Sequence, residues 1–176
     1  MRTIKDLHSI FNNALQEQQF SGYPRELYEP FTYILSLGGK HMRPVMLLHA
    51  CELFCGDPIR AMPQAIAIEL FHNFSLIHDD IMDCAPLRRG LPAVHEKYNS
   101  TVALLSGDAM LITAYKYLVR ADHQMVTHLI DLFNDCAIRI CEGQQLDMNF
   151  EKSEILEIED YMGMVELKTA YLFATA

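Results

Sequence analysis

Three aspartates, Asp79, Asp80 and Asp83, lie at the end of an apolar segment that is typical of a buried helix. A carboxylate in apolar surroundings is costly unless a cation compensates its charge. Helical geometry places Asp79, Asp83 and His72 close together on one face. Two carboxylates on adjacent turns can share divalent cations such as Mg²⁺, which prefers oxygen ligands. We therefore predict a magnesium site at Asp79 and Asp83, with Asp80 on another face in an outer or water-mediated contact.

Basic side chains stand on both sides of the aspartates in a chain whose formal net charge is −9. Residues 38–44 combine two glycines with Lys40 and Arg43 at the start of a predicted helix, where free amides and the helix dipole favour an anion. Arg88 and Arg89 follow the aspartates in a short loop, and each could hold a different phosphate group. Either feature alone would more often be solvated surface. Together they predict a diphosphate site, with an apolar cavity between helices for a hydrocarbon tail.

Polar residues within other apolar stretches are further candidates. His72 is interpreted either as a hydrogen-bond donor to a bound anion or as a satisfied core histidine, and less readily as a metal ligand. Lys168 would be costly to bury without an anion. Gln144, Gln145 and Asp147 interrupt an apolar helix, and they either line a polar cavity wall or face solvent.

Helical periodicity extends over nearly the whole chain, which predicts a single helical domain over 1–176. No alternating stretch rich in β-branched residues is bounded by turns, so we expect no sheet. Pro30 is expected to kink or divide its helix. The apolar pattern from Tyr161 to Phe173 has no stop signal before Ala176, which suggests that further sequence follows. The expected helices are 4–20, 25–37, 43–54, 60–83, 94–98, 101–120, 123–150 and 153–175, with a loop over 84–93.

The composition limits the class of protein. The 176 residues are 51% hydrophobic, enough for a proper core. The acidic balance argues against a general nucleic-acid or anionic-membrane binder. No apolar window is long enough for a membrane span, and the N-terminus has no signal-peptide core. The five cysteines form no Cys-x-x-Cys pair, which indicates reduced thiols in a cytoplasm, with Cys51 and Cys55 as core thiols rather than zinc ligands.

Several motifs together resemble those of the trans-isoprenyl diphosphate synthase family. Residues 38–44, Gly-Gly-Lys-His-Met-Arg-Pro, are similar to the family's Gly-Gly-Lys-Arg-x-Arg-Pro motif, with His41 in place of the usual arginine. Residues 75–83 contain its first aspartate-rich motif, Asp-Asp-x-x-Asp. Further matches stand in the family's order at Arg88-Arg89-Gly90, Ser106-Gly107-Asp108, Glu142-Gly143-Gln144 and Lys168-Thr169. The resemblance covers nearly the whole chain, although the family's second aspartate-rich motif is absent from it.

The resemblance implies an all-α antiparallel helical bundle around a deep central cavity, represented here by its N-terminal portion, and usually a homodimer. It also implies a Mg²⁺-dependent prenyltransferase that condenses isopentenyl diphosphate head to tail with an allylic diphosphate. Without the second aspartate-rich motif, this stretch alone is expected to be inactive. Two alternatives stay open: an inactive or regulatory subunit of such an enzyme, and a terpene cyclase-like enzyme, which would not need the 38–44 site.

The resemblance also implies roles for single residues. Asp79 and Asp83 would hold the metal ions, and Arg88 and Lys168 would hold the allylic diphosphate. Isopentenyl diphosphate would be held by Lys40, Arg43, His72 and Arg89. The developing carbocation would face the Lys168 carbonyl, the Thr169 hydroxyl and the Gln145 amide.

The residues one turn before Asp79 bear on product length. Phe74 and Ser75 lie five and four positions before Asp79, about one turn deeper along the helix. In the family that the chain resembles, a bulky side chain there stops chain growth. A large residue at 74 and a small one at 75 favour a geranylgeranyl product within the C15–C20 range.

Overall fold

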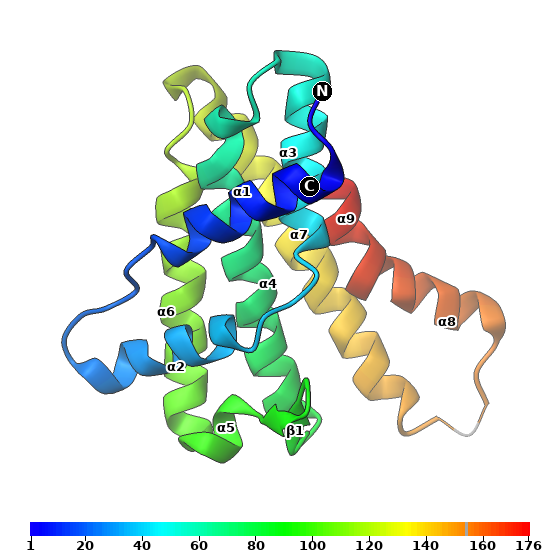
Figure 1. The fold of residues 1–176 in the computed structure, drawn as a ribbon. Coiled ribbons are helices and arrows are strands. Elements are labelled where there is room, and N and C mark those ends of the chain that lie inside the picture. Colours follow the sequence, from blue (N-terminus) through cyan, green and yellow to red (C-terminus); the bar gives the residue numbers. More distant parts are fainter. Residues whose placement is uncertain (154) are drawn as a thin grey trace. The chain divides into compact units, whose positions relative to one another are not determined.

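The computed structural model of the chain describes residues 1–153 and 155–176, without the side chain of Cys55. The described elements are almost entirely helical (Figure 1), so the predicted all-α fold class is confirmed. The chain forms two compact units, Met1–Arg120 and Ala121–Ala176. That the two act as one domain, as the sequence suggests, stays a prediction.

The first unit is organised around one long central helix, α4 (Met62–Met82). Its residues are apolar on nearly all sides, and those from Gln64 to Phe71 are buried without interruption, as expected of a helix enclosed by others. In Figure 1, α6 (Ser100–Leu118) runs back alongside α4, and the two helices make the most extensive packing of the unit. The surrounding elements are α1 (Ile4–Gln16), α2 (Arg25–Ser36), α3 (Met42–Cys55), the 3-10 turn η1 (Pro58–Ala61) and α5 (Val94–Lys97).

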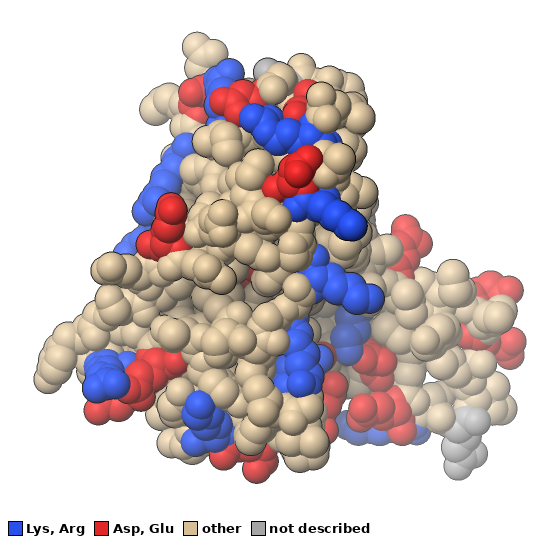
Figure 2. All heavy atoms as spheres, viewed as in Figure 1, with Lys and Arg blue, Asp and Glu red and all other residues tan. Residues whose placement is uncertain are grey.

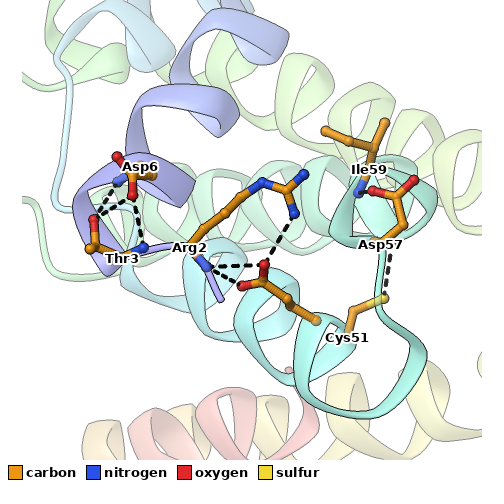
Figure 3. A network of polar contacts seen from close by, with 7 residues as sticks. Arg2, Thr3, Asp6, Cys51, Asp57 and Ile59 are labelled. Carbon is orange, nitrogen blue, oxygen red and sulfur yellow. Dashed lines mark hydrogen bonds and ion pairs between the residues drawn. The ribbon is translucent and has the colours of Figure 1, made fainter.

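The start of the chain is tied to α3 by polar contacts. Thr3 and Asp6 form a capping box at the N-terminus of α1, in which each side chain accepts from the other's backbone N–H. Arg2 donates to the Glu52 carboxylate from its backbone N–H at 3.0 Å and from Nη1 at 3.1 Å, and Figure 3 shows its side chain beside α3. These contacts fix the position of α1 against α3.

The second unit consists of α7 (His123–Phe150), α8 (Ile158–Val165), the π-helical turn η2 (Glu166–Ala170) and α9 (Tyr171–Thr175). Its tightest contact lies where η2 crosses Gly143 of α7. A Cβ atom at Gly143 would be 2.3 Å from the backbone nitrogen of Lys168, so only glycine allows the two backbones to approach this closely. Single π-helical turns are often found at functional sites.

Several predicted helix boundaries are wrong. The first helix ends at Gln16 instead of residue 20, because the Gln18 side chain donates to the Ala14 carbonyl at 2.8 Å and closes the last turn. Pro30 lies inside a continuous α2 and does not divide it. The last predicted helix, 153–175, begins only at Ile158, since Ser153 and 155–157 are not helical, while Glu154 lies outside the described residues.

The predicted thiol core at Cys51 and Cys55 is only partly tested. Cys51 is half-buried, and its thiol donates to the Asp57 carbonyl at 3.6 Å (Figure 3). The side chain of Cys55 lies outside the described residues. The four cysteines whose side chains are described are all free thiols.

The charge on the surface is mixed. Figure 2 shows Lys and Arg side chains interspersed with Asp and Glu on the visible face. Within the described part of the chain, no helix has the length and hydropathy to span a membrane.

Candidate active site

The two predicted metal ligands lie one helical turn apart at the C-terminal end of α4. The Asp83 N–H donates to the Asp79 carbonyl at 2.9 Å. The Asp79 side chain is 18% exposed, and Asp83 is exposed. This donor set fits Mg²⁺, which is usually bound by one or two carboxylates and keeps its other positions for water and substrate phosphates. No cluster of three or more potential metal-ligating side chains exists among the described residues.

Helix α4 ends directly after these aspartates in a Schellman motif. The Ala85 N–H donates to the Asp80 carbonyl at 3.0 Å, and the Cys84 N–H to the Ile81 carbonyl at 3.4 Å. Cys84 has a φ of 50°, in the left-handed region where glycine is the usual residue. The sharp stop turns the chain back, so that Arg88 lies beside Asp79 and Asp80.

Asp80 is fully buried and binds Arg88. The Arg88 Nε donates to the two carboxylate oxygens of Asp80 at 3.0 and 3.1 Å, and Nη2 also donates to Oδ1. The hydrogen bonds to Asp80 raise the pKa of Arg88 above its ordinary value, against the opposing effect of burial. Arg88 Nη2 lies 3.5 Å from Asp79 Oδ2. The sequence predicts Asp80 near the metal but not its partner; in the structure Asp80 holds Arg88 against Asp79.

Arg88 and Arg89 lie on a small hairpin that the sequence analysis did not predict. Strand β1 (Leu87–Arg88) pairs antiparallel with β2 (Leu91–Pro92). Arg89 and Gly90 form the turn with φ values of 54° and 79°, and positive φ at both positions is typical of type I′ hairpins. The expectation of no sheet was wrong because two-residue strands are too short to show alternation. The hairpin fixes the backbone of both arginines.

A second group of basic residues surrounds the start of α3. A Cβ atom at Gly39 would lie 3.0 Å from Arg89 Nη2, so this guanidinium rests against the glycine. Arg43 Nη1 lies 3.3 Å from His72 Nε2. Arg43, Arg88 and Arg89 all act electrostatically on His72, which shows that the two basic segments converge on one place. We call these four residues, Arg43, His72, Arg88 and Arg89, together with the exposed Lys40 that follows Gly39 in the chain, the basic cradle.

His72 is neutral in this cradle. Burial, and then the charges of Arg43, Arg89 and Arg88, lower the pKa of His72 from its ordinary value of 6.5 to about 4. A guanidinium can only donate, so His72 Nε2 is the acceptor and the proton is on Nδ1. His72 therefore accepts a hydrogen bond from Arg43 at Nε2, and its Nδ1–H remains a donor at neutral pH.

The low pKa of His72 makes stability depend on pH. Because the unfolded chain binds this proton more readily, the stability contributed by neutral His72 is complete above pH 6.5 and is lost as the pH falls toward 4. His72→Gln removes this effect, so the variant should gain about 2 kcal/mol relative to wild type between pH 7.5 and pH 5. Urea unfolding of both proteins at the two pH values measures it. An equal stability difference at both would contradict the assignment.

The polar residues of the second unit form their own group. Lys168, on η2, donates to Asp147 Oδ2 at 2.5 Å, which identifies the anion that the sequence analysis required for this lysine. Thr169 follows it and is exposed. The π-helical turn presents both residues, and Gly143 allows that turn to approach α7.

The two glutamines of α7 differ in their surroundings. Gln145, the predicted residue, is exposed and donates to Asn149 Oδ1 at 3.0 Å. Gln144 is half-buried, and its amide nitrogen is buried without a hydrogen-bond partner among the described residues. A buried amide without a partner is costly, so of the two glutamines Gln144 is the stronger functional candidate, although the family resemblance had assigned the role to Gln145.

Phe74 and Ser75 lie on α4 one turn before the aspartates. The Phe74 ring packs edge-on against the His78 ring, with 4.6 Å between the ring centroids. It also packs at a tilt against the Phe71 ring, with 5.7 Å between the centroids. The Ser75 hydroxyl donates to the His72 carbonyl at 2.8 Å. The neighbouring rings thus hold the large side chain in place below Asp79.

Comparison with known proteins gives consistent matches over this chain. Residues 24–176 match the model of the polyprenyl synthetase family. A geranylgeranyl diphosphate synthase of Methanosarcina mazei is 40% identical over 175 residues, which are 98% of this chain and 54% of that protein. A geranylfarnesyl diphosphate synthase of Natronomonas pharaonis is 38% identical over 192 residues, covering 98% of this chain and 56% of that protein.

A solved structure described as a geranylgeranyl pyrophosphate synthase is similar to this one with a TM-score of 0.93 at 40% identity. The match covers 99% of this chain and 55% of the other. The chain therefore spans about half the length of the curated relatives it matches.

Proposed function

Because the chain belongs to the polyprenyl synthetase family, we propose that the full-length protein condenses isopentenyl diphosphate head to tail with an allylic diphosphate. The observation that carries this proposal is that Arg88, a member of the basic cradle, has its Nη2 3.5 Å from the Asp79 carboxylate. Cations beside an acidic pair suit a substrate whose phosphates bridge metal and arginine. The names of the relatives favour a geranylgeranyl product.

In this proposal, different residues of the first unit bind the two diphosphate substrates. Asp79 and Asp83 hold Mg²⁺, which when bound supplies Lewis-acid stabilisation of the leaving diphosphate. Arg88, positioned by Asp80, binds the allylic diphosphate. Isopentenyl diphosphate is bound by Lys40, Arg43, Arg89 and the neutral His72.

The reaction proceeds through a carbocation. The allylic carbon–oxygen bond breaks and its electron pair leaves with the diphosphate. The double bond of isopentenyl diphosphate attacks the cation, and a proton is lost to restore a double bond. We propose that the Lys168 carbonyl, the Thr169 hydroxyl and a glutamine amide of α7 face the cation. The unpartnered amide favours Gln144 over the initially predicted Gln145 for this position.

We also propose a homodimer in the cytoplasm. Leu105 and Ile112, which are 59% and 58% exposed, lie seven residues apart on one face of α6, and Val119, its C-cap, continues the same spacing. An apolar stripe of this kind suits burial against a second copy of the chain. The free thiols are compatible with a reducing compartment.

Phe74 is expected to limit the length of the product. Phe74→Ala should yield products at least one C5 unit longer than those of wild type, because the ring below Asp79 no longer blocks the growing chain. Ser75→Phe should shorten them. Chromatography of the labelled products measures both. The matched control is Phe31→Leu, a change at a buried ring of α2 that makes its ring contacts with Phe20 and Tyr28. Unchanged products with Phe74→Ala would contradict the assignment.

A direct assay tests the proposed function. The full-length protein is incubated with Mg²⁺, labelled isopentenyl diphosphate and allylic primers of different length, and the products are separated by chromatography. We expect Mg²⁺-dependent incorporation of label into a C15–C20 diphosphate. No incorporation with any primer would favour an inactive or regulatory subunit.

A further inference from the structure

A buried carboxylate beside the basic cradle has no role in the function proposed above. Glu69 lies on α4 and is 2% exposed. Its Oε1 lies 3.1 Å from Nδ1 of His41, whose side chain is itself 8% exposed, and it accepts from Asn73 Nδ2 at 2.9 Å. Burial, the largest single effect, raises the pKa of Glu69, but His41, His72 and Asn73 together outweigh it, so the pKa lies below its ordinary value. The carboxylate is therefore charged and has a specific partner.

His41 occupies a strained position in the chain. Its φ and ψ are 44° and 37°, in the left-handed region, which costs a residue with a Cβ about 1–2 kcal/mol. It is the N-cap of α3, but its side chain makes no capping hydrogen bond. The ring instead packs on Phe11 and His8 of α1, at 5.4 and 5.9 Å between centroids. Such a conformation persists only where the surroundings hold it.

This strained turn lies between two cradle residues in the sequence. Lys40 directly precedes His41, and Arg43 follows it in the first turn of α3. Arg43 contacts His72, which lies one turn after Glu69 on the same side of α4. The pairs Glu69–His41 and His72–Arg43 thus tie the start of α3 to α4 at two adjacent points.

Resting on the proposed function, we propose that Glu69 is a positioning residue for isopentenyl diphosphate. Through His41 it holds the left-handed turn at the start of α3 and thereby fixes Lys40 and Arg43 where they bind the diphosphate. Glu69 does not touch the substrate. Its effect should therefore appear in the binding of one substrate and leave the chemical step unchanged.

Steady-state kinetics of the full-length protein test this role. Glu69→Gln removes the charge with little change of shape, and His41→Gln removes the pair from the other side. Each should raise the KM for isopentenyl diphosphate about 10-fold, which corresponds to about 1.4 kcal/mol of binding free energy. The KM for the allylic diphosphate and kcat should change less than about twofold. His41→Arg supplies a permanent charge that can reach the same carboxylate and should keep the wild-type KM.

Glu52→Gln is the matched control. It makes the same substitution in another carboxylate, which pairs with Arg2 (Figure 3) and lies near the opposite end of α3 from Arg43. Both KM values should stay as in wild type. If Glu69→Gln and His41→Gln alter both substrates equally, or alter thermal stability alone, the positioning role is overturned while the proposed function stands. If the wild type incorporates no isopentenyl diphosphate, both proposals fail. If Glu69→Gln does not fold, the two His41 variants decide.

Discussion

Replacement of Asp79 by alanine is expected to lower kcat/KM of the full-length protein by about 10³-fold. In our account Asp79 provides a metal oxygen ligand on the side of α4 that faces Arg88. Loss of a metal that stabilises the leaving diphosphate removes several kcal/mol of transition-state stabilisation, and each 1.4 kcal/mol corresponds to about a factor of ten. Initial rates at saturating Mg²⁺ measure the effect.

The control for this variant is Asp135→Ala, a change at an exposed aspartate of α7. It should keep nearly wild-type kcat/KM, which separates the loss of a ligand from the loss of one negative charge. Thermal unfolding should show Asp79→Ala folded, since the side chain lies at a helix end and is partly exposed. Activity of Asp79→Ala within tenfold of wild type would refute its role as a metal ligand.

Arg88→Gln is expected to have the largest effect on stability. Asp80 is fully buried, and Arg88 is the cation that holds its carboxylate. Removing one partner of a buried pair leaves an uncompensated charge and costs about 3–5 kcal/mol. The free energy of unfolding, measured with urea, should fall by that amount. The KM for the allylic diphosphate should rise as well, because the same guanidinium binds it in our proposal.

A double variant separates these two effects. Arg88→Gln with Asp80→Asn removes both charges and should regain most of the stability, while the KM for the allylic diphosphate stays high. Arg25→Gln is the control, since Arg25 forms an exposed pair with Glu29, at 2.6 Å, and such pairs contribute about 1 kcal/mol or less. A loss of stability no larger than that of Arg25→Gln would contradict the buried pair.

The helical class and the main elements could be predicted because their signals are local. Helix α7 matches its predicted bounds, residues 123–150, since a polar N-terminal boundary and a continuous apolar periodicity both lie in adjacent sequence. The central helix α4 was recognised from its apolar run. The aspartate spacing on α4 likewise follows from helical geometry alone, so the sequence is enough to place Asp79 and Asp83 one turn apart.

The contacts that complete the site depend on the folded chain. The sequence does not show that Asp80 binds Arg88, because that contact depends on the Schellman turn at Cys84. Such a turn is usually recognised by a glycine, which is absent here. The hairpin of Arg88 is too short for a strand pattern. The pairing of Lys168 with Asp147 joins residues 21 apart through a π-helical turn, which periodicity cannot reveal. The role of Glu69 was missed for the same reason, since its partner His41 is distant in the sequence.

Calorimetric titration of the full-length protein with inorganic diphosphate tests the central claim most directly, namely that the aspartates of α4 and the basic cradle form one metal-dependent diphosphate site. We predict that added Mg²⁺ tightens binding at least tenfold in wild type, and that Asp79→Ala abolishes this gain while a weaker, Mg²⁺-independent binding to the cradle remains. Equal affinity with and without Mg²⁺, or an undiminished Mg²⁺ effect in Asp79→Ala, would contradict the account.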